Sequence, residues 1–252
     1  MINIHIKKCF AGFCLEVNEK FETGKFYALY GKSGSGKTTF FRVLSGLERS
    51  KGIILVNDVI WQDERKFLPP QKRDIGYVFQ DYALFPNMSV LENLLFVRYD
   101  INYAKRLLEM VELYEYKDRF PQTLSGGQKQ RVAIIRALMK KPKILLLDES
   151  LSALDEEVKE KIKKEIKIIH NEFNLTTFII THQREDIYDL ADELIYIDSG
   201  KVTKRETISE SVLLKPTIIE GKVVFVPNQD ISIENLNHYF FKVKKPNSHQ
   251  KK

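Results

Sequence analysis

A glycine-rich segment near the N-terminus constrains this sequence more than any other feature. The pattern G-x-x-x-x-G-K-[ST] is matched by Gly31, Lys32, Ser33, Gly34, Ser35, Gly36, Lys37 and Thr38. The apolar run 26–30 before it predicts a buried strand, and apolar residues at helical spacing after it predict a helix over 38–47. A strand, a glycine-rich turn and a helix in this order open a βα unit, which favours an α/β fold.

Such a segment is suited to binding phosphate groups. Its glycines let backbone N–H groups curl around phosphate oxygens, and the following helix directs its positive end at the same anion. Lys37 would reach the β- and γ-phosphates, and the Thr38 hydroxyl would be a Mg²⁺ ligand. The alternative is a flexible glycine-serine loop, which the flanking strand and helix disfavour.

The rest of the chain alternates strands and helices, which predicts a mostly parallel sheet covered on both faces. We expect strands at 75–79, 144–147, 177–180 and 194–197, a hairpin over 52–60 that turns at Asn57-Asp58, and helices at 101–119, 132–139 and 156–173. The stretch from about 83 to 140 is nearly all helical and is predicted to be an insertion. The β-branched runs 217–220, 223–226 and 231–233 predict a small β appendage.

Composition excludes several classes of protein. The chain has 252 residues, 43% of them hydrophobic, which suits one large or two small globular domains. No run approaches the roughly 18 apolar residues of a membrane helix, and the N-terminus does not resemble a signal peptide. Cys9 and Cys14 are too few for a cysteine zinc site, and we expect two reduced thiols. Five of the 40 basic residues follow Glu234, so the net charge of +6 reflects a basic tail and is weak evidence for nucleic-acid binding.

Polar residues follow several of the predicted strands. Asp148 and Glu149 end the aliphatic strand 144–147, Gln80 follows 75–79, and His182 follows 177–180. The carboxyl ends of parallel strands converge on the usual ligand crevice. There Asp148 could hold Mg²⁺ and Glu149 could polarise an attacking water, although either acid could instead cap the next helix.

A second anion site is predicted at residues 125–128. Ser125, Gly126, Gly127 and Gln128 precede a helix that we expect to start near Lys129, so a hydroxyl and free N–H groups meet a helix N-terminus. Taken alone, Ser-Gly-Gly is only a helix-cap signal. One nucleotide could use both sites if two copies of the chain met face to face.

Six ordered motifs give the sequence a family resemblance. It resembles the nucleotide-binding subunit of ABC transporters over about residues 2 to 205. The motifs are a Walker A segment extending to Thr39 (31–39), a Q-loop at Gln80, the signature LSGGQ (124–128), Walker B ILLLDE (144–149), a D-loop SALD (152–155) and an H-loop at His182. The resemblance implies a P-loop NTPase of ABC type with a mostly parallel core sheet, a small antiparallel β subdomain, a helical subdomain inserted at about 83–140, and a short C-terminal β extension over 206–252.

The resemblance also implies roles for individual residues. Lys37 would bind phosphate, while Thr38, Gln80 and Asp148 would serve Mg²⁺. Glu149 would be the catalytic carboxylate, and His182 would contact the γ-phosphate and the attacking water. Across a dimer of two subunits, Ser125, Gly127 and Asp155 would act on the partner's nucleotide. An aromatic residue should stack on adenine: Phe10 is the first candidate and Phe13 the second, although either could belong to the core.

The resemblance is greatest to importer subunits, within which loop similarities favour the molybdate and sulfate types. It implies an ATPase peripheral to the cytoplasmic side of the membrane, with ATP and Mg²⁺ as cofactors. Its partners would be a second copy, membrane permease subunits and an extracytoplasmic solute-binding protein. An oxyanion such as molybdate, tungstate or sulfate is the expected solute. Ferric iron, a polyamine or a sugar is the alternative. A soluble ABC ATPase acting on nucleic acid or ribosomes is a rival from another class.

Overall fold

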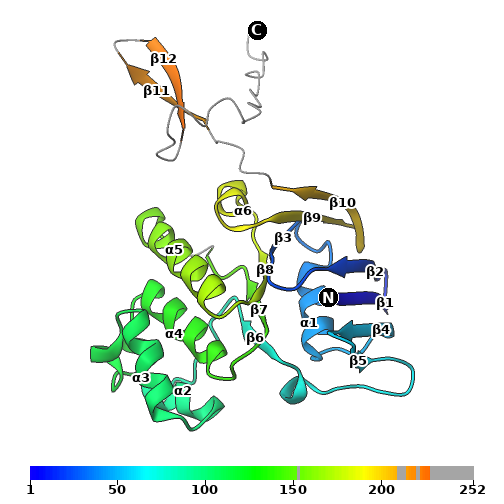
Figure 1. The fold of residues 1–252 in the computed structure, drawn as a ribbon, viewed down its shortest axis with the longest axis horizontal. Coiled ribbons are helices and arrows are strands. Elements are labelled where there is room, and N and C mark those ends of the chain that lie inside the picture. The colour runs from blue at the N-terminus through cyan, green and yellow to red at the C-terminus, as the bar shows by residue number, and fades with distance from the viewer. Residues whose placement is uncertain (152–153, 209–213, 220–221, 228–252) are drawn as a thin grey trace. The chain divides into compact units, whose positions relative to one another are not determined.

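The computed structural model describes residues 1–151, 154–208, 214–219 and 222–227, the last two ranges by their backbone. The chain divides into two compact units, Met1–Thr207 and Ile208–Lys252. The first unit is built on one ten-stranded sheet in the order β5-β4-β1-β2-β10-β9-β3-β8-β7-β6 (Figure 1).

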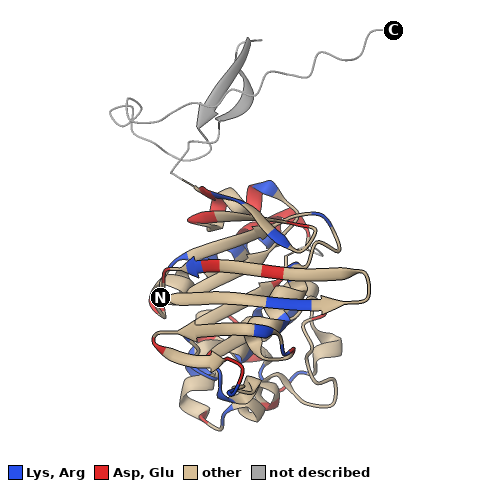
Figure 2. Ribbon diagram, turned by 90° about the vertical axis from the view of Figure 1, so that its right-hand side faces the viewer, with Lys and Arg blue, Asp and Glu red and all other residues tan. Residues whose placement is uncertain are grey.

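One part of this sheet is antiparallel. It consists of two hairpins, β1 (Ile2–Phe10) with β2 (Phe13–Phe21), and β4 (Lys51–Val56) with β5 (Val59–Gln62). The predicted turn at Asn57 and Asp58 is confirmed, and φ values of 46° and 63° fit a type I′ turn. The sequence analysis did not delimit the first hairpin. Figure 2 marks lysines on β1 and both glutamates and a lysine on β2.

The other part of the sheet is mostly parallel, as predicted. Its strands are β3 (Phe26–Tyr30), β6 (Ile75–Val78), β7 (Ile144–Asp148), β8 (Thr176–Ile180) and β9 (Glu193–Asp198), followed by the antiparallel β10 (Lys201–Thr207). A single pair, Lys201 with Glu16, joins β10 to β2 and so connects the two parts. The carboxyl ends of β6, β7 and β8 therefore meet at one edge, which positions the residues that follow them.

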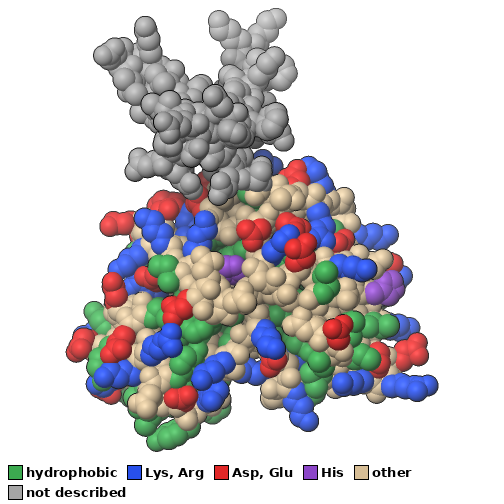
Figure 3. Space-filling model, viewed as in Figure 1, with side chains coloured by type: hydrophobic (Ala, Val, Ile, Leu, Met, Phe, Trp, Pro, Cys, Tyr) green, Lys and Arg blue, Asp and Glu red, His purple; other side chains and the backbone are tan. Residues whose placement is uncertain are grey.

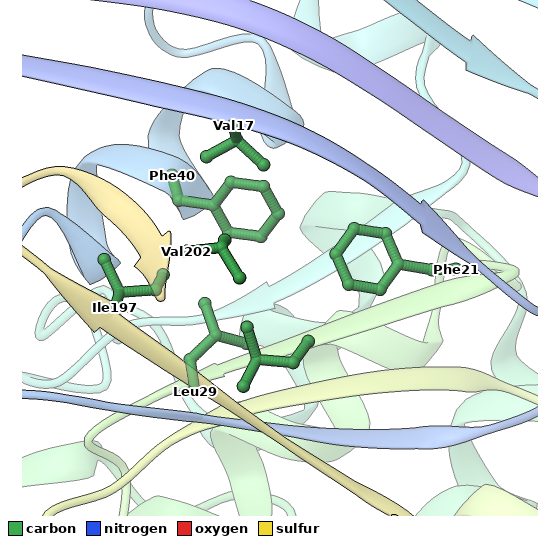
Figure 4. A pocket seen from close by; sticks show the side chains of 7 residues that line it. Val17, Phe21, Leu29, Phe40, Ile197 and Val202 are labelled. Atoms are coloured by element: carbon green, nitrogen blue, oxygen red, sulfur yellow. The ribbon is translucent and has the colours of Figure 1, made fainter. Parts of the chain in front are cut away.

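The main core encloses helix α1 (Lys37–Ser45) between the two parts of the sheet. Phe40, Phe41 and Leu44 of this helix are buried against apolar side chains of both parts. Figure 4 shows a small apolar pocket of this core that is too narrow for a water molecule; it is lined by Val17, Phe21, Leu29, Phe40, Ile195, Ile197 and Val202. This packing fixes the start of α1, and hence the glycine-rich segment, relative to β3.

The predicted helical insertion lies between β6 and β7. Its α-helices are α2 (Val90–Val97), α3 (Ile101–Met110) and α4 (Gly126–Leu138), shown in cyan-green to green in Figure 1. The expected helix over 101–119 is wrong beyond Met110, because Glu112 adopts a left-handed φ of 57° and ends it. Helix α4 starts at Gly126, before Lys129, because Ser125 caps it.

The remaining elements close the first unit and begin the second. Helices α5 (Glu156–Glu172) and α6 (Arg184–Leu190) flank β8, and the prediction of a helix over 156–173 is confirmed. The second unit contains β11 (Leu214–Ile219) and β12 (Lys222–Pro227), which pair antiparallel. The predicted run 231–233 lies outside the described residues. Among the helices that the structure describes, none combines the length and apolar character needed to cross a bilayer.

The expectation of two reduced thiols is wrong in this structure. Cys9 and Cys14 form a disulfide across the β1–β2 hairpin. The reason is the strand register, which pairs Cys9 directly with Cys14 and brings their Cα atoms to 4.0 Å. Composition alone could not reveal this, because it depends on where the hairpin turns.

Candidate nucleotide-binding site

The glycine-rich segment forms a loop between β3 and α1, as predicted. Gly34 and Gly36 adopt positive φ values of 77° and 107°, which side-chain-bearing residues rarely tolerate. At Gly31 a Cβ would lie 2.0 Å from the carbonyl oxygen of Ile197. The N-cap of α1 is Gly36, which has no side chain to bond the first N–H groups of the helix. These groups are therefore left to an external acceptor, as a phosphate site requires.

Two further polar groups of the loop fit an anion. The Lys37 side chain is only 4% exposed, and its Nζ donates to the carbonyl oxygens of Gly31 and Lys32, each at 2.9 Å. Burial lowers the pKa of Lys37, while the nearby Glu149 and Asp148 oppose that shift. The Ser35 hydroxyl is buried and makes no hydrogen bond within the described protein. A buried polar group without a partner is costly, and a phosphate oxygen would satisfy it.

Asp148 ends β7 beside the loop. Its carboxylate accepts from the Thr38 hydroxyl at 3.3 Å and from the Tyr77 hydroxyl at 2.8 Å. Asp148 is 5% exposed, and its burial raises its pKa against the two hydrogen bonds, which lower it. Hydroxyl and carboxylate oxygens are the hard donors that Mg²⁺ prefers, and Mg²⁺ needs only one or two of them beside phosphates and water. The Thr38–Asp148 pair therefore fits this cation.

Glu149 connects the ends of three parallel strands. The Gln80 amide, after β6, donates to one of its carboxylate oxygens at 3.2 Å, and the His182 Nε2, after β8, lies 2.9 Å from the other. The Glu149 backbone has a φ of 47°, a left-handed conformation that is strained for a glutamate. Strain of this kind persists where the surroundings fix a residue, and here it holds the carboxylate between Gln80 and His182.

A buried ion pair supports the segment that carries His182. Lys159 Nζ of α5 lies 2.7 Å from Asp186 of α6, with 3% and 1% of their side chains exposed, and Lys159 also bonds Gln183. Asp186 in turn accepts from the Thr181 hydroxyl at 3.0 Å. The pair therefore connects α5 to the residues on both sides of His182.

The second predicted anion site lies at the start of α4. The Ser125 hydroxyl accepts from the Gln128 N–H at 3.3 Å, and the Gln128 side chain accepts from the Ser125 N–H at 2.9 Å. Ser125 and Gly126 are exposed, whereas Gly127 is buried, and a Cβ on it would lie 2.5 Å from Val158. Asp155 caps α5 by accepting from the Val158 N–H at 3.0 Å. No hydrogen bond among the described residues joins these two helix starts to the glycine-rich loop.

The two aromatic candidates lie at the end of the β1–β2 hairpin. Phe10 pairs with Phe13 across the strands. Phe10 is 47% exposed beside Lys8, whose ammonium lies 5.1 Å from the ring centroid. Phe13 is half-buried and lies against the loop, since a Cβ on Gly36 would come within 2.9 Å of its ring.

The structure adds residues that the sequence analysis missed. Tyr77 was treated only as part of a predicted strand and Lys159 only as part of a predicted helix, and Asp186 was assigned to no element. A tyrosine in the strand beside the one ending in Asp148 was an available signal, because neighbouring parallel strands share an edge. No sequence signal indicated the Lys159–Asp186 ion pair, because the pair depends on how α5 and α6 pack.

Taken together, the loop, the two hard oxygen donors and the oriented carboxylate define a P-loop nucleotide-binding protein. The sequence profile of the ABC transporter family matches residues 14–152. The chain belongs to the ABC transporter family.

Several curated proteins are similar over most of the chain. The molybdenum import ATP-binding protein ModC of Pseudomonas fluorescens is 36% identical over 222 residues, which cover 84% of this chain and 62% of that protein. ModC of Methylococcus capsulatus is 40% identical, with 80% and 58% covered. The sulfate/thiosulfate import ATP-binding protein CysA 2 of Shewanella oneidensis is 38% identical, with 83% and 63% covered. The chain thus spans less than two thirds of the length of these relatives.

Known structures share the fold. The dimeric ATP-binding cassette MJ0796 in a post-hydrolysis state, bound to ADP and Pi, superposes with a TM-score of 0.71 at 28% identity, covering 83% of this chain and 99% of that one. The structure of cbiO1 from Clostridium perfringens, part of the ABC transporter complex cbiONQ, gives a TM-score of 0.73 at 26% identity, with 82% and 88% covered.

Proposed function

We propose that this chain is the ATP-hydrolysing subunit of a transporter that imports an oxyanion, molybdate, tungstate or sulfate, through separate membrane subunits. The observation that carries the ATPase proposal is the position of Glu149, held by Gln80 and His182 beside the Lys37 loop. The names of the molybdenum and sulfate/thiosulfate import relatives support the solute class. We place the nucleotide-binding domain at residues 1–205 and a separate extension at 206–252.

In this proposal each residue of the loop has a defined task. The N–H groups at the start of α1 and the Lys37 ammonium bind the β- and γ-phosphates. Mg²⁺ would be held by Thr38 and Asp148, with Gln80 nearby, and would neutralise phosphate charge. Glu149 accepts a proton from the attacking water, and His182 orients that carboxylate and the γ-phosphate. Phe10 stacks on the adenine ring. The phosphate-binding loop is completed by Gly31, Lys32, Ser33, Gly34, Ser35, Gly36 and Thr39.

The exposed starts of α4 and α5 support a role across a dimer. Among the described residues, the side chains of Ser125, Gln128 and Asp155 make only local helix-cap hydrogen bonds. Gly126 and Gly127 lie in the first turn of α4. We propose that Ser125, Gly126, Gly127, Gln128 and Asp155 act together to complete the nucleotide site of a second copy, with two ATP molecules between the subunits. The dimeric state of the similar cassette MJ0796 supports this arrangement.

An exposed apolar surface on the helical insertion suits a membrane partner. Phe96 is 62% exposed and packs edge-on against the half-buried Phe85 at 4.8 Å between ring centroids, with Val97 and Tyr99 exposed nearby. Figure 3 shows hydrophobic side chains at the lower left, where Figure 1 places α2 and α3. We propose that this surface and residues 82–86 contact a permease subunit, which places the protein at the cytoplasmic face of the membrane with a solute-binding protein on the other side.

The elemental composition of cells tests the proposed solute. Cells that carry Glu149→Gln are compared with wild type under limiting molybdate and limiting sulfate, with Lys164→Gln on the exposed face of α5 as the control. The proposal predicts a selective fall in molybdenum, tungsten or sulfur in the Glu149→Gln cells only. A fall in iron alone, or no change in any element, would contradict the oxyanion assignment.

A further inference from the structure

The Cys9–Cys14 disulfide lies at the end of the hairpin that borders the glycine-rich loop. Only one further pair, Phe10 with Phe13, separates it from the two-residue turn at Ala11 and Gly12. Successive residues of a strand point to opposite faces, so the two cysteines share one face and the two phenylalanines share the other. Both cysteines are exposed to solvent, and an exposed disulfide is open to exchange with other thiols.

The opposite face of this hairpin end contacts the phosphate-binding loop. A Cβ at Gly36 would come within 2.9 Å of the Phe13 ring and 3.2 Å of Leu15. The Glu16 N–H donates to the Gly200 carbonyl at 2.7 Å, and the Gly200 N–H donates to the Ser35 carbonyl at 3.0 Å. A Cβ at Gly200 would collide with the Cys14 carbonyl oxygen at 1.9 Å. Gly36 is therefore packed directly against Phe13 of the segment that the disulfide closes, and Ser35 is connected to Cys14 through Gly200.

We propose that Cys9 and Cys14 are a reversible redox site, oxidised by a low-molecular-weight or protein disulfide, and that their bond raises nucleotide affinity by fixing the hairpin end against the loop. This inference rests on the proposed binding of nucleotide at the loop. The bond joins residues five apart in sequence and already opposite in register, so it forms without rearranging the strands. Fixing Phe10 and Phe13 beforehand reduces the ordering cost of binding.

The chemistry is a thiol–disulfide exchange. The thiolate of one cysteine attacks a sulfur of the incoming disulfide, whose S–S bond breaks and releases one thiol. The second cysteine thiolate then attacks the protein sulfur of the mixed disulfide, forms the Cys9–Cys14 bond and releases the second thiol. Two electrons and two protons pass from the cysteine pair to the oxidant, which leaves as two thiols.

The test compares two redox states of the full chain. The protein is equilibrated with oxidised glutathione or with dithiothreitol, the disulfide is verified by intact mass after thiol alkylation, and MgADP binding is measured by calorimetry. We expect the oxidised form to bind MgADP about three- to tenfold more tightly than the reduced form. Cys9→Ser and Cys14→Ser should bind like the reduced form in both buffers.

The matched control alters the neighbouring pair on the same face. Lys7 and Glu16 form an exposed ion pair at 3.4 Å. Lys7→Gln removes this pair and leaves both cysteines in place, so the oxidised form of the variant should still bind MgADP more tightly than its reduced form. Equal MgADP affinity in both redox states would overturn this inference alone, as would mixed disulfides in place of the Cys9–Cys14 bond. Failure of both states to bind MgADP would overturn the proposed function together with this inference.

Discussion

The two groups of predicted site residues differ in how far this chain alone assembles them. Around the glycine-rich loop, side chains from separate elements bond to one another: Thr38 and Tyr77 to Asp148, and Gln80 and His182 to Glu149. At the starts of α4 and α5, the side-chain hydrogen bonds that Ser125 and Asp155 make with described residues stay within their own helix ends. The first group is organised by the sheet edge, and the second is presented on the surface. The difference supports the proposal that one chain builds the reacting half of the site and presents the other half to a second copy.

The largest effect is expected from the carboxylate at the centre of the first group. Glu149→Gln keeps the size and the bond to Gln80 but removes the base, so kcat for ATP hydrolysis should fall by about 10²- to 10⁴-fold while ATP still binds. Phosphate release and equilibrium nucleotide binding check this. Lys164→Gln is the control. Turnover at the wild-type rate would show that the organised half does not contain the reacting base.

Ser125→Arg tests the surface half. An arginine at this exposed N-cap position places a long cation where a second copy would approach, so steady-state hydrolysis should fall by at least about tenfold. The binding of MgADP to the isolated chain should change by less than about twofold, because Ser125 makes no bond to the loop. Lys129→Arg, a charge-conserving change on the same helix, is the control. A large loss of MgADP affinity in Ser125→Arg would mean that the two halves meet within one chain.

The Lys159–Asp186 pair tests the connection between the two groups. Lys159 lies one turn after Asp155, and its partners lie beside His182. Lys159→Met removes the nearer cation from the buried Asp186 and leaves only Lys163, whose Nζ lies 3.8 Å from the same carboxylate. We therefore expect a loss of about 2 kcal/mol in the free energy of unfolding and a lower kcat. Denaturant unfolding measures it, with the exposed Lys164→Met as the control. Adding Asp186→Leu should recover part of the stability, and a loss no larger than that of Lys164→Met would contradict the account.

A smaller effect is expected at Tyr77. Its hydroxyl lowers the pKa of Asp148, which burial raises, so Tyr77→Phe should raise that pKa further. Mg²⁺ binding needs the ionised Asp148 carboxylate. The loss of Mg²⁺ binding at acidic pH should therefore begin at a higher pH in Tyr77→Phe than in the wild type. At neutral pH, loss of this hydrogen bond should lower the free energy of unfolding by about 1 kcal/mol. Mg²⁺-dependent nucleotide binding, measured across pH, reports the shift of the acid limb, with Tyr103→Phe of α3 as the control. An acid limb at the same pH in Tyr77→Phe and wild type would show that Asp148 does not bind the cation.

Much of the fold and the loop group could be predicted from sequence, for a physical reason. The elements that matter are local: Ile144–Leu147 is a purely aliphatic strand, and the glycine-rich turn has a strand and a helix at its sides. The edge at which Gln80, Glu149 and His182 meet follows from parallel pairing alone. The positions of Gln80, Glu149 and His182 after predicted parallel strands were therefore enough to select them as site candidates.

The rest depends on contacts between distant segments. Arg73 is fully buried, and its guanidinium donates to the carbonyl oxygens of Val43 and Leu44 at the end of α1, a role that no local pattern indicates. The Cys9–Cys14 bond depends on the register of a hairpin, and the helix expected to run to 119 ends early because of one left-handed residue, Glu112. The Arg73 contacts, the disulfide and the end of this helix all depend on tertiary geometry, which cannot be deduced from sequence periodicity.

The oligomeric state with ATP bound tests the central claim most directly. The claim is that two half-sites complete each other across two copies of the chain. Light scattering with size-exclusion chromatography is applied to Glu149→Gln with MgATP, and to Glu149→Gln combined with Ser125→Arg. The account predicts a dimer for the first and a monomer with nucleotide still bound for the second. A Glu149→Gln protein that binds ATP and remains a monomer at every concentration would contradict it.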